Sequence, residues 1–362
     1  MGTRMGMSKV IDPKAKLFQH LDRLADIKAG KKPAPVNVEI DLSNRCDLKC
    51  GGCHFAYTHT RGPWAGHADK PDGAISGGDL MDTNLAMNIL YQLRYAGVKS
   101  ITWTGGGEPT LHPRFDDIVK QAHFGGLEQG IYSHGGWIKG ERAAFMKQDF
   151  KWIYFSFDAH DVESYKAYKG VNRFDRVCEN IRDLVALPGK ATVGMGFLLS
   201  SDNYTQIYNM QKLGRDLGVN YVQFRPTVHF DQDKPNVLVE DTGWITEAIQ
   251  LLGQYGDDPF IIADAERFRG YQNWNGHPYK TCNWSALQTV ITPNGKVWRC
   301  TNKREHPDAL LGDLSVESFD TLWARSGGAC GVDSSCRIFC RGHAANLVLD
   351  EVFADAPHQN FV

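Results

Sequence analysis

Short apolar strands alternate with amphipathic helices along most of the chain, and this alternation constrains the fold more than any other feature. One helix begins after Asp82, a favourable N-cap residue, and ends at Gly97. The expected strands span residues 36–42, 100–103, 129–133, 152–158, 192–199 and 221–224. Further expected helices span residues 13–29, 114–124, 140–147, 161–169, 173–186 and 203–217. Repeated strand and helix units predict an α/β fold with a parallel sheet, whose ligands bind at the carboxyl ends of the strands.

Length and charge exclude several classes of protein. With 362 residues the chain is long enough for one large α/β domain and a smaller one. Its 40 Lys and Arg residues are well mixed with 42 Asp and Glu residues, so we expect no binding site for duplex nucleic acid. No apolar run approaches the length of a membrane span, and the first thirty residues do not resemble a signal peptide. We therefore expect a cytoplasmic protein.

The nine cysteines are distributed in a way that predicts metal clusters and not disulfides. Eight lie in two groups, at residues 46–53 and 282–340. Cys178 stands alone and shares a helical face with Phe174, Ile181 and Val185, so we expect it in the hydrophobic core.

The first group, Cys46, Cys50 and Cys53, lies on one short loop after the first expected strand. Three thiolates can bind three irons of a cubane 4Fe–4S cluster, which normally has four cysteine ligands. The fourth iron is then open and can chelate a small molecule. The alternative is a structural zinc site in which His54 is the fourth ligand.

This spacing resembles the signature of the radical S-adenosylmethionine (radical SAM) superfamily. The resemblance implies a partial (β/α)6 TIM-like barrel in which Cys46, Cys50 and Cys53 hold the catalytic cluster and S-adenosylmethionine binds the open iron. An electron donor such as flavodoxin or ferredoxin reduces the cluster, and the resulting 5′-deoxyadenosyl radical abstracts a substrate hydrogen. Relatives commonly have an aromatic residue before the third cysteine, where this chain has Gly52, so His54 or Phe55 is expected to contact the adenine.

A glycine-rich stretch, residues 105–109, directly follows the second expected strand. Glycine lets a backbone approach a ligand closely, and a neighbouring carboxylate can accept a hydrogen bond from an amine. The resemblance assigns contacts with the methionyl amino group to Gly106, Gly107 and Glu108.

Further cofactor contacts are expected where later strands end. The resemblance places Ser156 and Asp158 at the ribose, and Ser133, followed by His134, loosely matches another position that borders S-adenosylmethionine. Arg225 stands where a fixed cation can meet a carboxylate of the cofactor or the substrate, and a salt bridge at the rim of the barrel is the alternative.

The second group of cysteines resembles the SPASM/Twitch extension of radical SAM enzymes. A hairpin turn is expected at residues 293–295, and five cysteines are present where the full SPASM pattern has seven. We therefore predict one auxiliary 4Fe–4S cluster, with zinc as the alternative. Its predicted ligands are Cys282, Cys300, Cys336 and Cys340. Cys330 is then spare, either as a hydrogen donor to a substrate radical or without a role.

These expectations divide the chain into five parts. They are an N-terminal helical leader (1–34), a radical SAM barrel (35–235), a helical connection (236–280), an auxiliary cluster module (281–345) and a C-terminal tail (346–362). The irregular stretch 54–80 is expected to be either a lid over the substrate or a surface insertion.

Three functions are compatible with the sequence. The first is a radical SAM oxidoreductase that acts on a small polar substrate such as a sugar, nucleoside or nucleotide, with dehydrogenation favoured over epimerisation or cyclisation. The second is modification of a peptide, which we rank lower because residues 1–35 are too few for a peptide-recognition domain. The third is a non-enzymatic iron–sulfur or zinc protein, which predicts no cleavage of S-adenosylmethionine.

Overall fold

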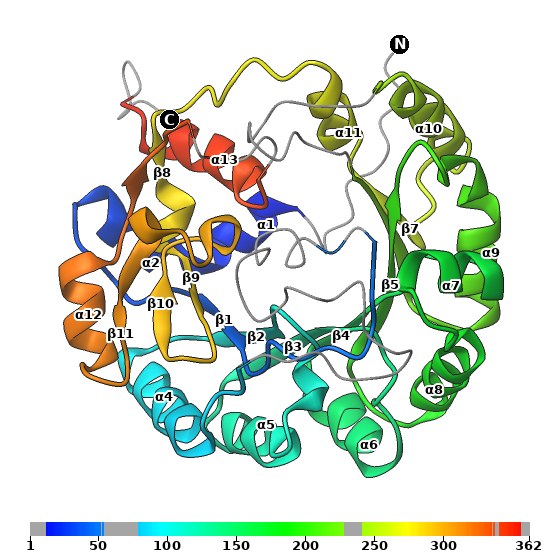
Figure 1. Cartoon of the computed structure of the whole chain (residues 1–362). Coiled ribbons are helices and arrows are strands. Elements are labelled where there is room, and N and C mark those ends of the chain that lie inside the picture. Colours follow the sequence, from blue (N-terminus) through cyan, green and yellow to red (C-terminus); the bar gives the residue numbers. More distant parts are fainter. Residues whose placement is uncertain are drawn as a thin grey trace.

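The computed structural model describes residues 12–51, 53, 79–227, 241–334, 336 and 340–355, and the structural statements below concern these residues. One sheet contains ten strands in the order β11-β10-β9-β1-β2-β3-β4-β5-β6-β7. Its parallel strands are β1 (Asn37–Asp41), β2 (Ser100–Thr104), β3 (Glu128–Ser133), β4 (Trp152–Ser156), β5 (Thr192–Leu199), β6 (Tyr221–Pro226) and β7 (Ile261–Ala263). The sheet curves into a partial barrel with helices around its outside (Figure 1).

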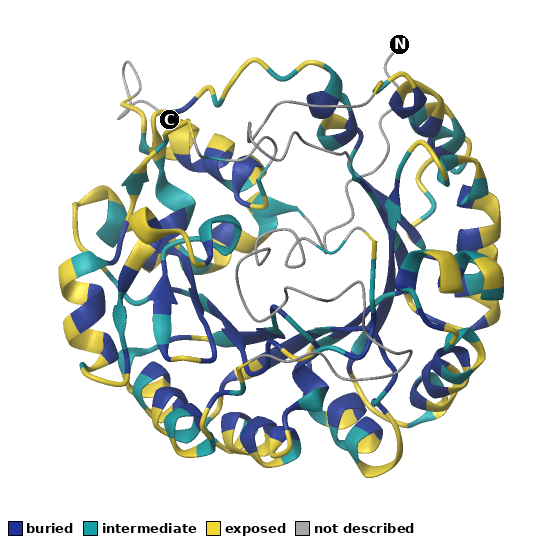
Figure 2. Cartoon of the chain, in the orientation of Figure 1, coloured by how far each residue is buried: buried dark blue, intermediate teal, exposed yellow. Residues whose placement is uncertain are grey.

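The helices of the barrel follow its strands in sequence, as the alternation predicts. They are α4 (Thr83–Ala96), α5 (Phe115–Phe124), α6 (Gly140–Asp149), α7 (Val162–Lys169), α8 (Phe174–Ala186), α9 (Ile207–Asp216), α10 (Trp244–Gly253) and α11 (Ala265–Gln272). Their outward faces are exposed and their inward faces are buried against the sheet (Figure 2). Cys178 is buried in α8, so its predicted place in the core is confirmed.

Local sequence explains how α4 forms where it does. The carboxylate of Asp82 accepts a hydrogen bond from the Leu85 N–H (3.0 Å), which satisfies a donor that the first turn leaves open. Gly97 ends the helix with φ 88°, a left-handed conformation that glycine adopts without steric cost. Between them Ile89 and Leu93 are buried on one face.

Successive residues of each strand point to opposite faces of the sheet. On β4, Ile153 and Phe155 join the large core under the helices, whereas Tyr154 packs with Tyr221 and Ile262 on the inner side of the barrel. On β1, Val38 and Ile40 likewise join the outer core. The inner face of the barrel is therefore aromatic and polar.

The C-terminal extension continues the sheet of the barrel. Strand β9 (Gln288–Ile291) pairs parallel to β1, and β10 (Lys296–Trp298) and β11 (Leu310–Asp313) follow in antiparallel order. The predicted hairpin turn joins β9 to β10, and Gly295 within it has φ 79°. We predicted a boundary between the barrel and the cluster module at residue 281, but strands from both sides of it belong to one sheet. Helix α12 (Phe319–Ser326) contacts α4, and the pair β8 (Thr281–Cys282) and β12 (Cys330–Gly331) lies beside the sheet.

Helices from the two ends of the chain pack together. Helix α1 (Pro13–Leu17) contacts α13 (His343–Phe353), and α2 (Leu21–Lys28) follows α1 after a short 3-10 turn. Leu17 and Leu24 from the N-terminal helices join Leu287 and Leu349 in a second, smaller core. The expected N-terminal leader is thus held by the C-terminal helix.

The structure differs from the sequence prediction at several element ends. Strand β7 lies within the predicted helical connection. The sequence did not predict it, because three residues are too few to produce a recognisable period. Strand β4 ends at Ser156, and Asp158 instead adopts φ 60°, a left-handed conformation that does not continue a strand. Strand β6 extends to Pro226 and so includes Arg225. No helix within the described ranges is both long and apolar enough to cross a membrane.

Candidate active site

The loop that carries Cys46, Cys50 and Cys53 follows the carboxyl end of β1 and is held from two sides. On one side the Lys49 N–H donates to the carbonyl of Lys169 at the end of α7 (2.8 Å). The Gly51 N–H donates to the carbonyl of Tyr168, the preceding residue of the same helix (3.0 Å). These backbone bonds fix the position of the loop without using the thiols.

The glycine-rich stretch after β2 holds the other side of the cysteine loop. The Glu108 N–H donates to the carbonyl of Arg45 (2.8 Å), and the Gly107 N–H donates to that of Ser43 (3.1 Å). A Cβ at Gly107 would lie 2.1 Å from the Arg45 carbonyl oxygen, and one at Gly106 would lie 2.5 Å from Asn44 Oδ1. These positions therefore need glycine to pack against the cysteine loop, a role that the sequence did not reveal.

The three thiols of the loop are partly buried and free of disulfides. Burial raises the pKa of Cys46 well above its ordinary value and that of Cys50 to about 11. Both groups therefore ionise readily only when a metal centre supplies positive charge, and metal binding to cysteine requires the thiolate.

The separation of the sulfur atoms tests which metal centre fits. A single tetrahedral zinc ion holds its thiolates about 3.8 Å apart, given Zn–S bonds of about 2.3 Å. Among the described residues no three cysteine sulfurs lie within 4.8 Å of one another. A cubane separates its thiolates more widely because each binds a different iron, so it does not need three sulfurs this close together. His54 and Phe55, the other residues predicted here, lie outside the described residues.

Asp47 anchors the loop from within. Its buried carboxylate accepts hydrogen bonds from His134 Nε2 (2.8 Å), from Trp137 Nε1 (2.9 Å) and from Arg173. Burial alone would raise the pKa of Asp47, but the hydrogen bonds from His134, Arg173 and Trp137 hold it well below its ordinary value. Sequence reasoning missed this network, because its members lie far from Asp47 along the chain.

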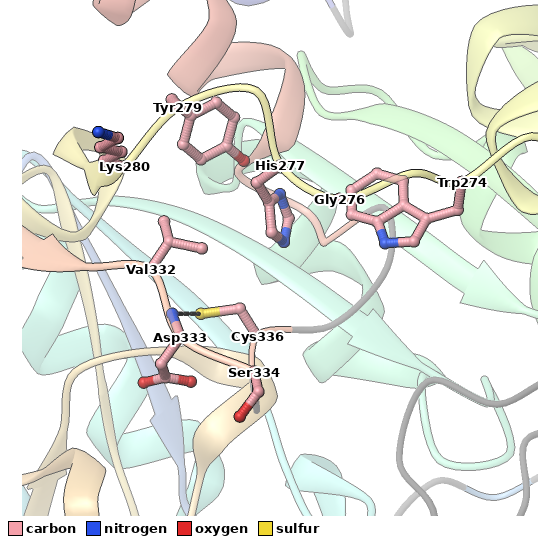
Figure 3. A pocket seen from close by; sticks show the side chains of 9 residues that line it. All are labelled: Trp274, Gly276, His277, Tyr279, Lys280, Val332, Asp333, Ser334 and Cys336. Carbon is pink, nitrogen blue, oxygen red and sulfur yellow. Dashed lines mark hydrogen bonds between the residues drawn. The ribbon is translucent and has the colours of Figure 1, made fainter.

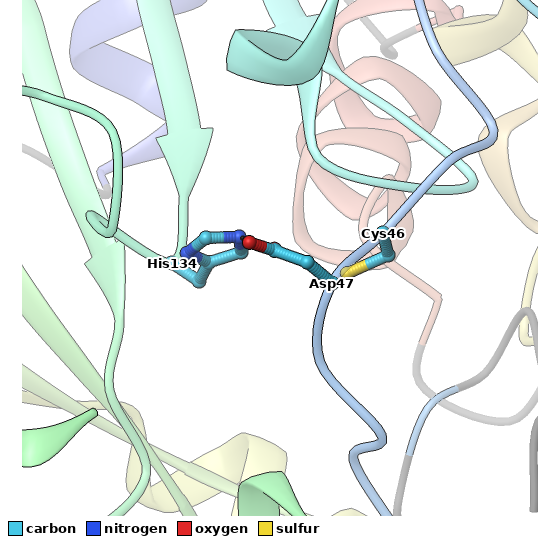
Figure 4. A group of neighbouring side chains, drawn as sticks. All are labelled: Cys46, Asp47 and His134. Atoms are coloured by element: carbon cyan, nitrogen blue, oxygen red, sulfur yellow. Dashed lines mark hydrogen bonds and ion pairs between the residues drawn. The ribbon is translucent and has the colours of Figure 1, made fainter. Parts of the chain in front are cut away.

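Cys46, Asp47 and His134 are close enough together to suggest a metal site (Figure 4). His134 Nδ1 accepts a hydrogen bond from the Gly136 N–H (3.0 Å), so Nε2 carries the proton that is donated to Asp47. Both oxygens of the Asp47 carboxylate are thus occupied, Oδ1 by His134 and Oδ2 by Trp137 and Arg173. We therefore interpret this group as an anchor of the cysteine loop.

Glu108 and Ser133, both predicted to contact S-adenosylmethionine, contact each other. Ser133 Oγ donates to Glu108 Oε1 (2.7 Å), and the His134 N–H donates to Oε2 (2.9 Å). Thr110 Oγ1 also donates to this buried carboxylate. Glu108 thus joins the end of β3 to the cysteine loop, and its direct contact with the cofactor stays a prediction.

Asp158 and Ser156 are joined through Lys169. The Lys169 ammonium donates to Asp158 Oδ2 (2.7 Å) and to the carbonyl of Ser156 (2.8 Å), and Leu198 N–H donates to the other carboxylate oxygen (2.9 Å). Burial lowers the pKa of Lys169, but the nearby carboxylate of Asp158 and other groups raise it by more. The pKa of Lys169 therefore lies above its ordinary value. The contacts of Ser156 and Asp158 with the ribose remain predictions. Through Lys169 the end of β4 is joined to α7, which in turn is bonded to the cysteine loop.

Arg225 lies over the ring of Tyr154, with 5.3 Å from Cζ to the ring centroid. Among the described residues it forms no ion pair, so the alternative of a salt bridge at the rim of the barrel is not observed.

The second cysteine group is assembled from separate segments. The antiparallel pair β8 and β12 places Cys330 directly opposite Cys282. A hydrogen bond from the Cys282 thiol lowers the pKa of Cys330 to about 6. Cys300 is influenced electrostatically by Cys330 and Cys336, and Cys340 by Cys300 and Cys336, so all five thiols belong to one neighbourhood. Cys330, predicted to be spare, is the cross-strand partner of a predicted ligand.

A pocket of about 510 Å³ lies beside this second group (Figure 3). Trp274, His277 and Tyr279 line one side and Cys336 the other. The Asp333 N–H donates to the Cys336 sulfur (3.5 Å). The pocket therefore borders the predicted auxiliary cluster and not the cysteine loop after β1.

Comparison with known proteins places this architecture in a family. Residues 40–213 match the model of the radical SAM superfamily, and the chain belongs to that superfamily. A cofactor-modifying protein for tungsten-containing aldehyde ferredoxin oxidoreductase from Pyrococcus furiosus is 24% identical over 209 residues, which cover 56% of this chain and 54% of that protein. A probable GTP 3′,8-cyclase from Saccharolobus solfataricus is 25% identical over 187 residues, or 51% and 55% of the two chains. The chain thus spans about half the length of these curated relatives.

Solved structures show the same fold at low sequence identity. SuiB from Streptococcus suis bound to S-adenosylmethionine superposes with a TM-score of 0.61 at 15% identity, covering 85% of this chain and 69% of that one. Native anSMEcpe with bound S-adenosylmethionine gives a TM-score of 0.58 at 16% identity, covering 88% and 99%.

Proposed function

We propose that this protein is a radical SAM oxidoreductase that cleaves S-adenosylmethionine reductively and removes a hydrogen atom from a small polar substrate. The observation that carries the proposal is the cysteine loop after β1, whose three thiols are presented by a backbone clamped between the glycine-rich stretch and α7. Three ligands on a fixed loop suit a cluster with one open iron.

In this proposal Cys46, Cys50 and Cys53 hold the catalytic 4Fe–4S cluster. When bound and reduced, the cluster supplies the electron that splits S-adenosylmethionine. Gly106 and Gly107, which pack against the loop, are predicted to contact the cofactor as well. The other predicted contacts are Phe55, Glu108, Ser133, Ser156 and Asp158. Arg225 is predicted to meet a carboxylate of either the cofactor or the substrate.

The second cysteine group is proposed to hold one auxiliary 4Fe–4S cluster in a SPASM/Twitch-type extension. Five thiols in one neighbourhood supply the four ligands that a cubane takes. Cys282, Cys300, Cys336 and Cys340 are the proposed set. Such a cluster would either accept an electron from the substrate radical or position the substrate. The first of these roles is why we favour dehydrogenation.

Two features support a small polar substrate. The interior of the barrel carries charged and hydroxyl-bearing side chains, such as Glu39, Arg225 and Tyr154. The curated relatives bear names that refer to a cofactor and to GTP. SuiB has been solved with its precursor peptide SuiA, so peptide modification is the second candidate.

The proposal is tested by anaerobic reconstitution and analysis of the purified chain. We expect about eight irons per chain if two cubanes are present, and formation of 5′-deoxyadenosine when the protein is reduced in the presence of S-adenosylmethionine. Replacement of Cys46, Cys50 and Cys53 by alanine should abolish this product. Cys178→Ala is the matched control, because this thiol is buried in α8 away from both groups, and it should keep both iron and activity. A zinc-loaded protein without iron, or undiminished product from the triple variant, would refute the proposal.

A further inference from the structure

Several buried carboxylates of the barrel are paired with cations. Arg304 contacts Asp41 on β1, with 3.1 Å between Nε and Oδ2. Arg341 forms an ion pair with Glu39 on the same strand. The third pair, between Lys169 and Asp158, closes at 2.7 Å. This pairing is expected, because a buried charge without a partner loses its hydration and gains little in return.

Arg225 has no ion pair among the described residues. Its Nε is buried without a hydrogen-bond partner, and its guanidinium lies over the ring of Tyr154 without any ion pair. The ring face attracts the cation, but such an interaction offsets only part of the cost of leaving water. Arg225 therefore brings into the barrel a positive charge that is not paired with any described carboxylate, although Asp158 acts on it electrostatically.

The hydroxyl of Tyr154 is the second open group at this place. The tyrosine is 2% exposed, and its Oη has no hydrogen-bond partner. A Cβ at Gly196 on the neighbouring strand β5 would lie 1.8 Å from this oxygen, so glycine at that position leaves room for the hydroxyl. A buried hydroxyl normally finds a partner, and the described residues supply none to this one.

A second arginine and a second tyrosine stand beside this place. The rings of Tyr154 and Tyr132 pack edge to face with centroids 5.0 Å apart. Arg341 lies over Tyr132 (5.5 Å), as Arg225 lies over Tyr154. Two arginines therefore stand over two touching rings, and only Arg341 has a carboxylate, Glu39.

We propose that Arg225 and Tyr154 bind an oxyanionic group of the substrate, either a carboxylate or a phosphate. Guanidinium and phenol groups are both donors that bond strongly to an oxyanion, and the guanidinium can bond to two of its oxygens at once. Naming the ligand as the substrate rests on the proposed function. The inference narrows the substrate class from small polar molecules to acidic ones.

Tyr154→Phe separates this role from a purely structural one. The variant keeps the ring under Arg225 and deletes only the hydroxyl. Because the hydroxyl is buried without a partner, its removal should leave the stability of the fold unchanged or raise it. Anion binding, in contrast, should weaken.

The test uses the reconstituted, desalted holoenzyme and follows binding calorimetrically at constant ionic strength. Inorganic phosphate and succinate are the two probes, and they distinguish a phosphate-bearing from a carboxylate-bearing substrate. We expect saturable binding of at least one probe, with the affinity reduced roughly tenfold or more in Arg225→Gln. Tyr154→Phe should weaken binding without lowering the melting temperature. Arg269→Gln, on the exposed side of α11, should bind as the wild type does.

Several outcomes would overturn the inference. The first is that neither probe binds saturably. The second is that wild type and Arg225→Gln bind the probe with equal affinity. The third is that the probe competes with S-adenosylmethionine, which would mean that Arg225 binds the carboxylate of the cofactor. If Arg225→Gln does not fold, Arg225→Lys, which keeps the charge and loses the planar fork, and Tyr154→Phe decide the question. Formation of 5′-deoxyadenosine without anion binding refutes this inference alone, whereas absence of that product refutes the proposed function.

Discussion

The two cysteine groups of this protein are built in opposite ways. Cys46, Cys50 and Cys53 lie on one loop, whose backbone is bonded to the glycine-rich stretch and to α7. The second group collects its thiols from β8, from β12 and from loops between residues 300 and 340. The predicted ligands of the first site are therefore neighbours in the sequence, whereas the second group depends on the strand pairing that brings Cys282 and Cys330 together.

The contrast predicts different effects when one thiol is lost from each group. Cys46→Ser should reduce 5′-deoxyadenosine formation to background, because the loop has no replacement ligand. Cys282→Ser should remove about half of the iron, one cubane of two, and leave cleavage of S-adenosylmethionine measurable. Iron analysis and product assays on both variants provide the measurement.

The matched control for the second group is Cys330→Ser, which should keep the full iron content if Cys282 is the ligand. Loss of iron in Cys330→Ser with retention in Cys282→Ser would exchange the roles of the two cross-strand cysteines.

The anchor of the first loop should contribute strongly to stability. Asp47→Ala leaves Arg173 and His134 buried without their acceptor, so we expect the free energy of unfolding to fall by about 3–5 kcal/mol. Asp47→Asn keeps an acceptor oxygen and should cost less. Anaerobic urea denaturation measures both. For comparison, Asp216→Ala removes the exposed pair with Lys212 and should change stability by less than about 1 kcal/mol.

Packing of the glycine-rich stretch against the first loop is tested at Gly107. Because an added methyl group would overlap the Arg45 carbonyl, Gly107→Ala should destabilise the fold by roughly 1–3 kcal/mol and disturb the cysteine loop. Gly253→Ala, at the end of α10 with open space around its Cβ, should be neutral or slightly stabilising. Equal melting temperatures for the two variants would contradict the clamp.

The smallest predicted effect concerns pH and the contact between the extension and β1. Burial raises the pKa of Asp41 to about 7, although Arg304 lowers it in part. Between its unfolded value of 3.8 and about 7, the folded state holds a proton that the unfolded state has released. This contribution to stability is therefore fully present below 3.8 and is lost as pH rises through 7. Urea denaturation at pH 5 and pH 8 should show a smaller difference for Asp41→Asn than for the wild type.

Much of the barrel could be predicted from the sequence because its signals are local. Strand β5 spans the predicted residues 192–199, and α4 has the predicted cap at Asp82. Periodicity and capping need only a few neighbouring residues. Strand β7 was missed because three residues carry no period, and the pairing of β9 with β1 was missed because it joins segments far apart in sequence.

The candidate site shows the same division. The spacing of Cys46, Cys50 and Cys53 was sufficient to predict a cluster loop. The ion pair between Lys169 and Asp158, by contrast, depends on how α7 returns to the end of β4. A sequence lists possible ligands, but the hydrogen bonds that already occupy their polar atoms appear only in the folded chain.

The parallel pairing of β9 with β1 has a consequence for how the chain can be divided. Without the extension, β1 would present a row of unsatisfied amide and carbonyl groups along its open side. Such a border recruits strands from other molecules and leads to aggregation. The hairpin satisfies this side of β1, so a fragment trimmed to the barrel alone is a poor substitute for the intact polypeptide.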